Sequence, residues 1–337
     1  MNLETWIKKM PKVELHVHLE GSVRPETLLL LAKRHGIQLP ANTAEELRAW
    51  YTFTNFDHFI EIYMTISGCL RDPQDMELIA REFLAGQAAQ NIVYSEVTWT
   101  PLNQYHTSGM GFDEQLAAIN RARAWAEKEL NVRMSMVIDI PRGVPVEEGE
   151  LSADWAIRAR DNGVVAFGLG GPEIGNPPEV YTSAFARTRR AGLPGVPHAG
   201  ETAGPASIWG ALNALHAVRI GHGIHCLEDP ALVAELRARQ IPLEVCPTSN
   251  VCLKEARRIE DHPLPRLLAE GLFVTLGSDD PPMFNTTLTE EYLKVARVFR
   301  FGMKEIKKLA LNGVKASFLQ DEEKRRLEAV INSSLTC

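Results

Sequence analysis

The residues of this chain best suited to catalysis are histidines and carboxylates that stand at the ends of short apolar segments. In the run from residue 12 to residue 21, His16 and His18 are separated by a single valine. Side chains of a strand repeat with period two, so both imidazoles point to the same face. Such a pair is well placed to hold one metal ion, although histidine-rich strand ends also occur without metal.

Three other apolar segments end in the same types of residue. His198 and Glu201 follow one of them, His222 lies between two glycines in another, and Asp279 and Asp280 follow the third. A buried structural histidine, a tight turn or the turn chemistry of Asp-Asp-Pro explains each segment taken alone. All four sets stand at strand ends together, and this joint pattern predicts a metal-dependent enzyme.

A water molecule and four side chains make up the predicted coordination shell: His16, His18, His198 and Asp279. Catalytic zinc tolerates five ligands and lowers the pKa of bound water to about 7. His222 is then free to orient or deprotonate that water, and Glu201 to give a proton to the substrate. Zinc is expected from the nitrogen and oxygen ligands, although iron or cobalt fits the same set.

The segments that must position these residues are predicted to be eight strands. Each is an apolar run bounded by turn residues, and helical patterns lie between them. The runs are 13–19, 92–99, 132–140, 164–169, 195–199, 218–223, 242–246 and 273–278. Strand and helix repeat without a break in composition, which predicts an α/β fold with one (β/α)8 TIM-type barrel domain over residues 1–337. The carboxyl ends of its strands meet at one face, where barrel enzymes build their active sites.

Residues 38–71 form an insertion after the first predicted strand. It is rich in aromatic residues, with Phe53, Phe56, Phe59 and Tyr63 close together. An insertion at this place lies at the active-site face, so a lid or a substrate wall is one interpretation. The other is a helix that packs its own apolar stripe on the barrel, and the two are compatible. The last residues, 304–337, are predicted to be terminal helices.

Composition excludes several classes of partner. The 337 residues are 45% hydrophobic and 23% charged, and 36 basic residues stand against 43 acidic ones, for a net charge of -7. This balance lacks the basic footprint of a protein that binds a nucleic acid polymer. No apolar leader or membrane span is apparent, so no membrane partner and a cytoplasmic location are expected. Five scattered cysteines suggest no disulfide framework. The oligomeric state is left open.

The chain resembles the adenosine deaminase family of the amidohydrolase superfamily over essentially its whole length. The matching motifs are Pro-Lys-Val-Glu-Leu-His-Val-His-Leu-Glu-Gly (11–21), His-Ala-Gly-Glu (198–201), Arg-Ile-Gly-His-Gly (219–223), Cys-Pro-Thr-Ser-Asn (246–250) and Ser-Asp-Asp-Pro (278–281). Two-metal members of the superfamily generally carry a bridging lysine on the fourth strand. Residues 163–171 contain no lysine, so one zinc ion per chain is expected.

The resemblance implies a role for each site residue in removing the 6-amino group of a purine. Zinc is bound by the four ligands named above, with Asp279 also among the catalytic residues. Glu201 protonates N1, and His222 positions the attacking hydroxide at C6. Gly171 offers its backbone to N3, and Asp280 contacts N7. Each of these groups thus acts on one part of the purine as charge is redistributed during the reaction.

The substrate implied by the resemblance is an adenine nucleoside. Glu20 stands where adenosine deaminases often have an aspartate near the ribose 5′-hydroxyl, and residues 51–56, 167–175 and 278–284 are more similar to the bacterial aminodeoxyfutalosine deaminases. This similarity implies that the enzyme converts 6-aminodeoxyfutalosine to a futalosine-type product in menaquinone biosynthesis. Phe53 and Phe56 would then stack on the carboxyphenyl group, with a cation such as Arg24 or Arg71 near its carboxylate. Adenosine, converted to inosine in purine salvage, and then adenine are the alternative substrates.

Two other classes of function remain as alternatives. A barrel hydrolase that attacks an ester or an amide would have no purine for Asp280 and Gly171 to contact, so mutation of Asp280 separates it from a purine enzyme. A catalytically silent adenosine-binding protein predicts loss of Glu201 or of a metal ligand, and all of these residues are present.

Overall fold

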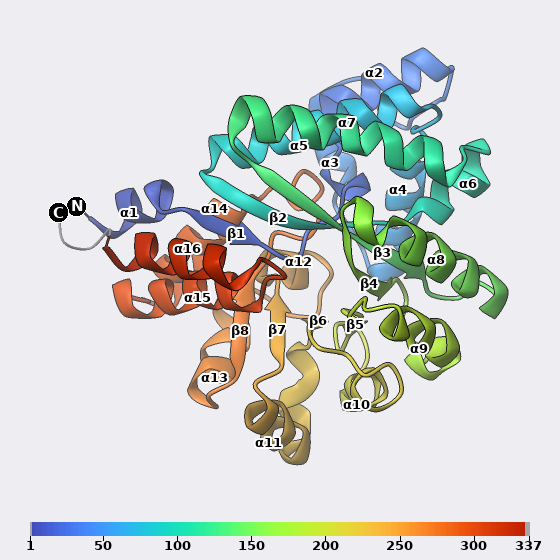
Figure 1. The fold of residues 1–337 in the computed structure, drawn as a ribbon. Helices are drawn as coiled ribbons and strands as arrows, with labels where there is room; N and C mark the ends of the chain where they lie inside the picture. Colours follow the sequence, from blue (N-terminus) through green and yellow to red (C-terminus); the bar gives the residue numbers. More distant parts are fainter. Residues whose placement is uncertain (1, 334–337) are drawn as a thin grey trace.

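The computed structural model describes residues 2–333, in which eight parallel strands are surrounded by helices (Figure 1). The strands are β1 (Lys12–Glu14), β2 (Ile92–Trp99), β3 (Arg133–Pro141), β4 (Val164–Gly170), β5 (His198–Ala199), β6 (Ile220–His222), β7 (Pro242–Val245) and β8 (Phe273–Leu276). Each of the eight predicted runs therefore contains or closely overlaps a strand. The predicted TIM-type α/β barrel is confirmed as the fold class.

The strands form two parallel sheets of four, ordered β1-β2-β3-β4 and β5-β6-β7-β8. Single bridges connect the two sheets at both seams, one between Val17 and Asp279 and one between Phe167 and Gly195. The barrel is thus joined at its seams by isolated bridges, and no continuous ladder closes it within residues 2–333. The seam at Asp279 lies where the predicted metal ligands meet.

The first predicted strand, 13–19, is shorter than expected. β1 ends at Glu14, the chain bends at His16, and the backbone hydrogen bonds of residues 17 and 18 alternate between two neighbours. The His18 amide donates to the Asp279 carbonyl at 2.9 Å, and the Thr98 amide donates to the Val17 carbonyl at 2.9 Å. This segment is therefore shared between the two sheets, and it carries both histidines of the first motif into the space between them.

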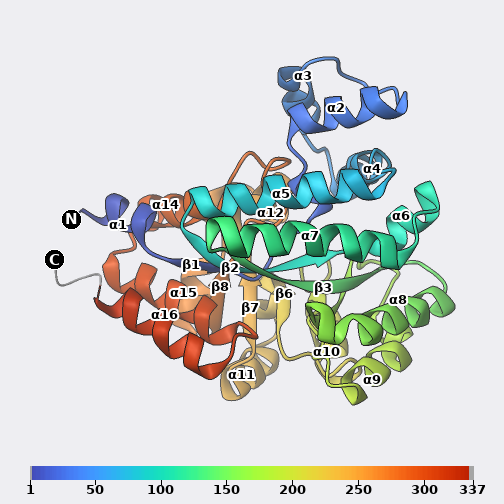
Figure 2. The ribbon, with the colours of Figure 1, turned by 45° about the horizontal axis from the view of Figure 1, so that its top comes forward.

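Helices cover the outside of the strands (Figures 1 and 2). They are α1 (Leu3–Lys9), α2 (Pro25–His35), α3 (Ala44–Trp50), α4 (Phe56–Ser67), α5 (Pro73–Ala89), α6 (Pro101–Ser108), α7 (Phe112–Leu130), α8 (Val146–Ala159), α9 (Thr182–Arg190), α10 (Pro205–Asn213), α11 (Pro230–Arg239), α12 (Pro247–Cys252), α13 (Leu264–Ala269), α14 (Leu288–Val298), α15 (Met303–Ala316) and α16 (Asp321–Ser333). Short 3-10 helices are η1 (Glu20–Ser22), η2 (Arg160–Asn162), η3 (Pro178–Tyr181), η4 (Ile224–Glu228) and η5 (Ile259–Asp261). Terminal helices were predicted over 304–337. They are present up to residue 333, and the last four residues lie outside the described part.

The predicted insertion contains α3 and α4. In Figure 2, α2 and α3 stand out from the rest of the molecule, whereas α4 lies closer to the strands. α4 begins after Asn55, whose side chain accepts a hydrogen bond from the His58 amide and so caps the helix. Its buried positions include Phe59, Ile62 and Ile66, which have the spacing of one helical face. The interpretation as a helix that packs its own apolar stripe is therefore correct.

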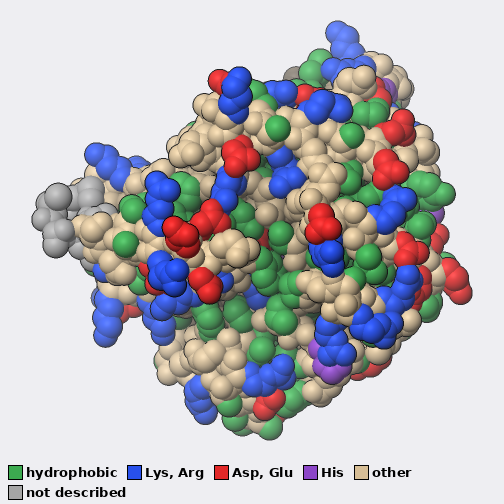
Figure 3. Space-filling view, in the orientation of Figure 1, with side chains coloured by type: hydrophobic (Ala, Val, Ile, Leu, Met, Phe, Trp, Pro, Cys, Tyr) green, Lys and Arg blue, Asp and Glu red, His purple; other side chains and the backbone are tan. Residues whose placement is uncertain are grey.

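The barrel contains buried charged residues in addition to the apolar layers between strands and helices. Arg219 is 1% exposed and forms ion pairs of 2.6 Å with both Glu96 and Glu244. Buried charges are tolerated only when they are paired in this way. The described residues include no helix long and apolar enough to cross a membrane. On the face shown in Figure 3, basic and acidic side chains are interspersed, so this face has no continuous basic surface.

Candidate active site

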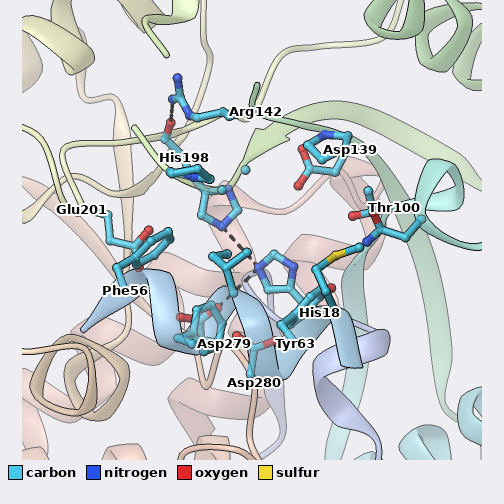
Figure 4. A pocket seen from close by; sticks show the side chains of 18 of the residues that line it. His18, Phe56, Tyr63, Thr100, Asp139, Arg142, His198, Glu201, Asp279 and Asp280 are labelled. Atoms are coloured by element: carbon cyan, nitrogen blue, oxygen red, sulfur yellow. Dashed lines mark hydrogen bonds and ion pairs between the residues drawn. The ribbon is translucent and has the colours of Figure 1, made fainter. Parts of the chain in front are cut away.

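Four side chains from three parts of the chain converge at the carboxyl ends of the strands. His16 and His18 come from the segment after β1, His198 from β5, and Asp279 from the segment after β8. One potential ligand atom of each lies within 4.8 Å of those of the others. The His18 Nε2 atom is 3.2 Å from His198 Nε2 and 3.3 Å from Asp279 Oδ1. Figure 4 shows both of these contacts as dashed lines.

The hydrogen bonds behind these ligands fit a metal site. His16 Nδ1 lies 3.0 Å from the Glu244 carboxylate, and His198 Nδ1 lies 3.1 Å from the Leu169 carbonyl. Each contact fixes the ring so that Nε2 faces the centre of the cluster. His16 Nε2 is buried and has no hydrogen-bond partner. A buried imidazole acceptor without a donor is unfavourable, and a divalent ion at the centre would satisfy it.

The local backbone is adapted to bring these side chains together. His222 and Asp279 adopt φ angles of 60° and 64°, in the left-handed region that non-glycine residues rarely occupy. A Cβ atom at Gly221 would lie 2.8 Å from His16 Cε1, and one at Gly277 would lie 2.7 Å from His16 Cβ. Gly221, beside His222, therefore makes room for the predicted metal ligand His16. A tight turn was the other explanation for this glycine.

Glu201 and His222 lie next to the cluster. His222 Nε2 is 3.5 Å from Glu201 Oε1 and 3.8 Å from Asp279 Oδ2. Burial, together with the charge of Asp279, raises the pKa of Glu201 well above its usual value. Burial and the nearby imidazoles lower the pKa of His222, so it is neutral. The site thus offers a carboxylic acid that can donate a proton and an imidazole that can accept one.

Glu173 fixes the loop that carries Glu201. Its carboxylate accepts hydrogen bonds from the amides of Gly200, Glu201 and Thr202, at 2.9, 2.7 and 2.9 Å. Three backbone donors on one buried carboxylate hold the loop after β5 in a single conformation. The sequence analysis gave Glu173 no role of its own, because its place behind this loop is not visible from spacing.

These groups open into a cavity of about 330 Å³, a size that suits a small-molecule ligand. Part of its wall is formed by three members of the cluster, His18, His198 and Asp279, together with Glu201 and His222; Gly171 and Asp280 also line it. The remaining wall is largely apolar and comes from α4, α6 and the segments after β3 and β4; its residues include Phe56, Phe59, Ile60, Met64, Pro141, Val144 and Pro172. The insertion therefore supplies a wall of the cavity in addition to packing on the barrel.

Four residues predicted to face the substrate side lie elsewhere. Glu20 is fully buried behind the cavity, where its carboxylate accepts a hydrogen bond from the Thr100 amide at 3.1 Å. Phe53 packs its ring against Phe59 at 5.4 Å between centroids and is not part of the cavity wall. Neither of the two candidate arginines lines the cavity: Arg71 donates to the Thr107 carbonyl, and Arg24 lies at a separate depression.

Several residues of the cavity wall were missed. Thr100 follows β2, and Asp139 and Arg142 stand at the carboxyl end of β3. Their positions after predicted strands could have revealed them, because every strand end of a barrel faces the site. Arg142 donates to the His198 carbonyl at 2.6 Å, so it also supports a predicted metal ligand.

The barrel and its cluster define a metal-dependent hydrolytic enzyme. Similarity to known proteins shows which family of such enzymes the chain belongs to. The adenosine deaminase family model matches residues 11–334. An aminodeoxyfutalosine deaminase of Streptomyces avermitilis is 41% identical over 98% of this chain and 93% of its own length. An adenine deaminase of Chlorobium phaeobacteroides is 38% identical over 98% of both chains. The crystal structure of adenine deaminase from Arthrobacter aurescens matches with a TM-score of 0.93 at 33% identity, over 97% of this chain and 100% of that one.

The chain therefore belongs to the adenosine deaminase family, as its motifs predicted. It is a metal-dependent deaminase of the amidohydrolase type that acts on a small molecule.

Proposed function

We propose that this enzyme uses zinc to remove the 6-amino group of an adenine nucleoside, and that its substrate is 6-aminodeoxyfutalosine, on the route to menaquinone. The observation that carries the proposal is the two-part cavity. One part holds the cluster of ligands with Glu201 and His222, and the other is an apolar extension bounded by α4 and α6. Similarity to the aminodeoxyfutalosine deaminase of Streptomyces avermitilis supports this substrate.

The residues that would hold one zinc ion are His16, His18, His198 and Asp279. Three imidazoles and one carboxylate are a donor set typical of catalytic zinc. When bound, the ion supplies a Lewis acid that makes water nucleophilic near neutral pH. A second potential donor group contains Cys246 and His222, but it shares His16 and Asp279 with the first, so we propose a single ion.

The proton transfers are assigned to two groups beside that cluster. Glu201, kept protonated by burial, donates its proton to N1 of the purine and so makes C6 electrophilic. His222, kept neutral, orients the attacking water and accepts its proton. Water adds at C6, the amino group takes the proton held by His222 and leaves as ammonia, and the proton of the new C6 hydroxyl returns to Glu201 to give the 6-oxo purine. The 3.5 Å between His222 Nε2 and Glu201 Oε1 lets both groups reach one reacting centre.

Two further groups would orient the purine. Asp280 is 2% exposed, and its Oδ1 atom has no hydrogen-bond partner. A Cβ atom at Gly21 would lie 1.5 Å from that oxygen, so the glycine of the first motif makes room for the carboxyl. We assign Asp280 to N7 and the backbone of Gly171, which has a φ angle of 95°, to N3.

The apolar extension would hold the carboxyphenyl group of the substrate. Phe56 and Ile60 of α4 and Val144 after β3 line it, and aromatic contacts of this kind stabilise a stacked ring. The carboxylate would lie near His106, which is about half exposed and whose Nε2 atom is 3.1 Å from the Glu148 carboxylate. Adenine is the second candidate substrate, because relatives at 38% and 33% identity are named adenine deaminases.

A comparison of three substrates tests the proposal. The specificity constant kcat/KM is measured for aminodeoxyfutalosine, adenosine and adenine by the ultraviolet change from 6-amino to 6-oxo purine. We expect a preference for aminodeoxyfutalosine of orders of magnitude. A preference for adenosine would assign the enzyme to purine salvage, and activity on adenine alone would refute a nucleoside substrate.

A further inference from the structure

Asp139 is a buried carboxyl in the cavity wall that the proposed chemistry does not use. It lies at the end of β3, is 3% exposed and lines the cavity. Its Oδ1 atom has no hydrogen-bond partner, and it forms no ion pair with the described residues. The backbone of Ile140 acts on the carboxyl, but a buried Oδ1 atom without a donor is costly, so this oxygen needs a donor from elsewhere.

The neighbouring strand leaves a space that this carboxyl occupies. A Cβ atom at Gly170 would lie 2.6 Å from Asp139 Oδ2, and one at Gly168 would lie 3.3 Å from Asp139 Oδ1. Any larger residue at Gly170 would displace the carboxyl from its position. Burial raises the pKa of Asp139 to about 8, although the charge of Arg142 and a backbone hydrogen bond from Ile140 act in the opposite direction.

The place of Asp139 relative to the catalytic groups indicates which part of a substrate it faces. In Figure 4, Asp139 and Thr100 lie on one side of the pocket, and Glu201 lies on the other, with the His198 ring between them. Glu201 is assigned to N1 of the purine, and N9, which carries the sugar, is at the far edge of the ring system from N1. Asp139 also adjoins Gly170, the neighbour of Gly171. Gly171 is assigned to N3, and only C4 separates N3 from N9 in the purine ring system.

We propose that Asp139 is a specificity-determining residue that accepts a hydrogen bond from a hydroxyl of the nucleoside sugar. The inference rests on the proposed function, because it takes the orientation of the purine from it. A sugar hydroxyl is a neutral donor that matches an unpartnered carboxyl oxygen. The apolar extension continues beyond this point, so a substrate long enough to fill the cavity passes Asp139 with its sugar.

The test compares adenosine with analogues that lack one sugar hydroxyl or the whole sugar. The constant kcat/KM is measured for adenosine, 2′-deoxyadenosine, 3′-deoxyadenosine and adenine, with the wild type, Asp139→Ala and Asp139→Asn. The wild type should lose about 10- to 100-fold on the analogue that lacks the contacted hydroxyl. In Asp139→Ala the difference between adenosine and the deoxy analogue should nearly vanish. The kcat/KM for adenosine should fall to that of the analogue, whereas the kcat/KM for adenine should change little. Asp139→Asn keeps an accepting oxygen and should restore most of the discrimination.

Three results would overturn the inference. An equal loss on all four substrates in Asp139→Ala, with unchanged metal content, would make the residue structural. An unchanged deoxy penalty would show that another group contacts the hydroxyl. A loss mainly on adenine would assign the carboxyl to the N9–H of a free base. If Asp139→Ala does not fold, Asp139→Ser takes its place. The wild-type rates test the proposed function separately from the variants. An enzyme that is active only on adenine would refute the proposed nucleoside substrate before any variant is made.

Discussion

The two parts of the cavity are built in opposite ways. The side that holds the histidines is buried, and a second polar group fixes several of its functional atoms: Glu244 behind His16, Leu169 behind His198 and Glu173 behind the Glu201 loop. The opposite side is apolar where α4 forms it, whereas α6 adds Asn103 and the half-exposed His106. The difference suggests that the first side sets the reaction and the second chooses the substrate.

Removal of a predicted metal ligand should have the largest effect. His198→Ala should lower kcat/KM by more than about 10,000-fold, because both the Lewis acid and the activated water depend on the bound ion. Metal content, measured by mass spectrometry, should fall with it. The exposed His216 provides a matched control, and His216→Ala should keep both metal and activity. Full metal content in His198→Ala would show that the ion lies elsewhere.

Glu201→Gln should come next, with a loss in kcat of about 100- to 1,000-fold. The amide is close in size to the acid but has no proton to transfer to the purine. Metal content should stay at the wild-type level, which separates this variant from the ligand variant. A loss confined to KM would mean that Glu201 binds substrate without acting as an acid.

The hydrogen bond behind His16 should have an intermediate effect. Glu244→Gln should weaken metal affinity by about 10- to 100-fold, since the partner behind a ligating imidazole tunes its orientation and basicity. Competition with a chelator measures this change, and excess metal should restore the activity. An activity loss that added metal does not reverse would instead indicate damage to the barrel interior, where Glu244 also pairs with Arg219 at 2.6 Å.

The opposite side of the cavity should respond to substrate length. Phe56→Ala should lower kcat/KM for aminodeoxyfutalosine by about 3- to 10-fold through loss of an aromatic contact. Adenosine, which does not reach this wall, is the internal control and should be nearly unaffected. An equal loss on both substrates would mean that α4 shapes the whole cavity, and the division into two parts would then be wrong.

Sequence patterns anticipated the two sides unequally, for a physical reason. Ligand motifs at strand ends were readable because a barrel brings every such end to one face, and the structure does gather His16, His18, His198 and Asp279 there. Glu20 illustrates the limit: its place in the motif suggested substrate contact, but its carboxylate binds the Thr100 amide behind the wall. Which side chain reaches the cavity depends on packing between distant segments, and local periodicity does not encode that.

The same limit explains why the sequence analysis misplaced Phe53 and missed Asp139. Phe53 belongs to the aromatic run that predicted a substrate wall, yet it packs on Phe59 and Phe284, and only part of the run faces the cavity. Asp139 was passed over, because one carboxylate in an apolar strand has no motif. Its space depends on two glycines of the neighbouring strand, and that relation appears only once β3 and β4 are paired.

The smallest expected effect concerns a histidine outside the cluster. The carboxylates of Glu255 and Glu228 raise the pKa of His225 from 6.5 to about 9. A raised pKa means that the folded state holds the proton more tightly, so the ion pairs stabilise the fold fully below pH 6.5 and lose their effect as the pH rises through about 9. His225→Gln should therefore lower the free energy of unfolding by about 1 kcal/mol or less at the acid end and by nothing above the folded pKa. Urea unfolding at both pH values measures this difference, and a deficit independent of pH would assign His225 to packing instead of charge.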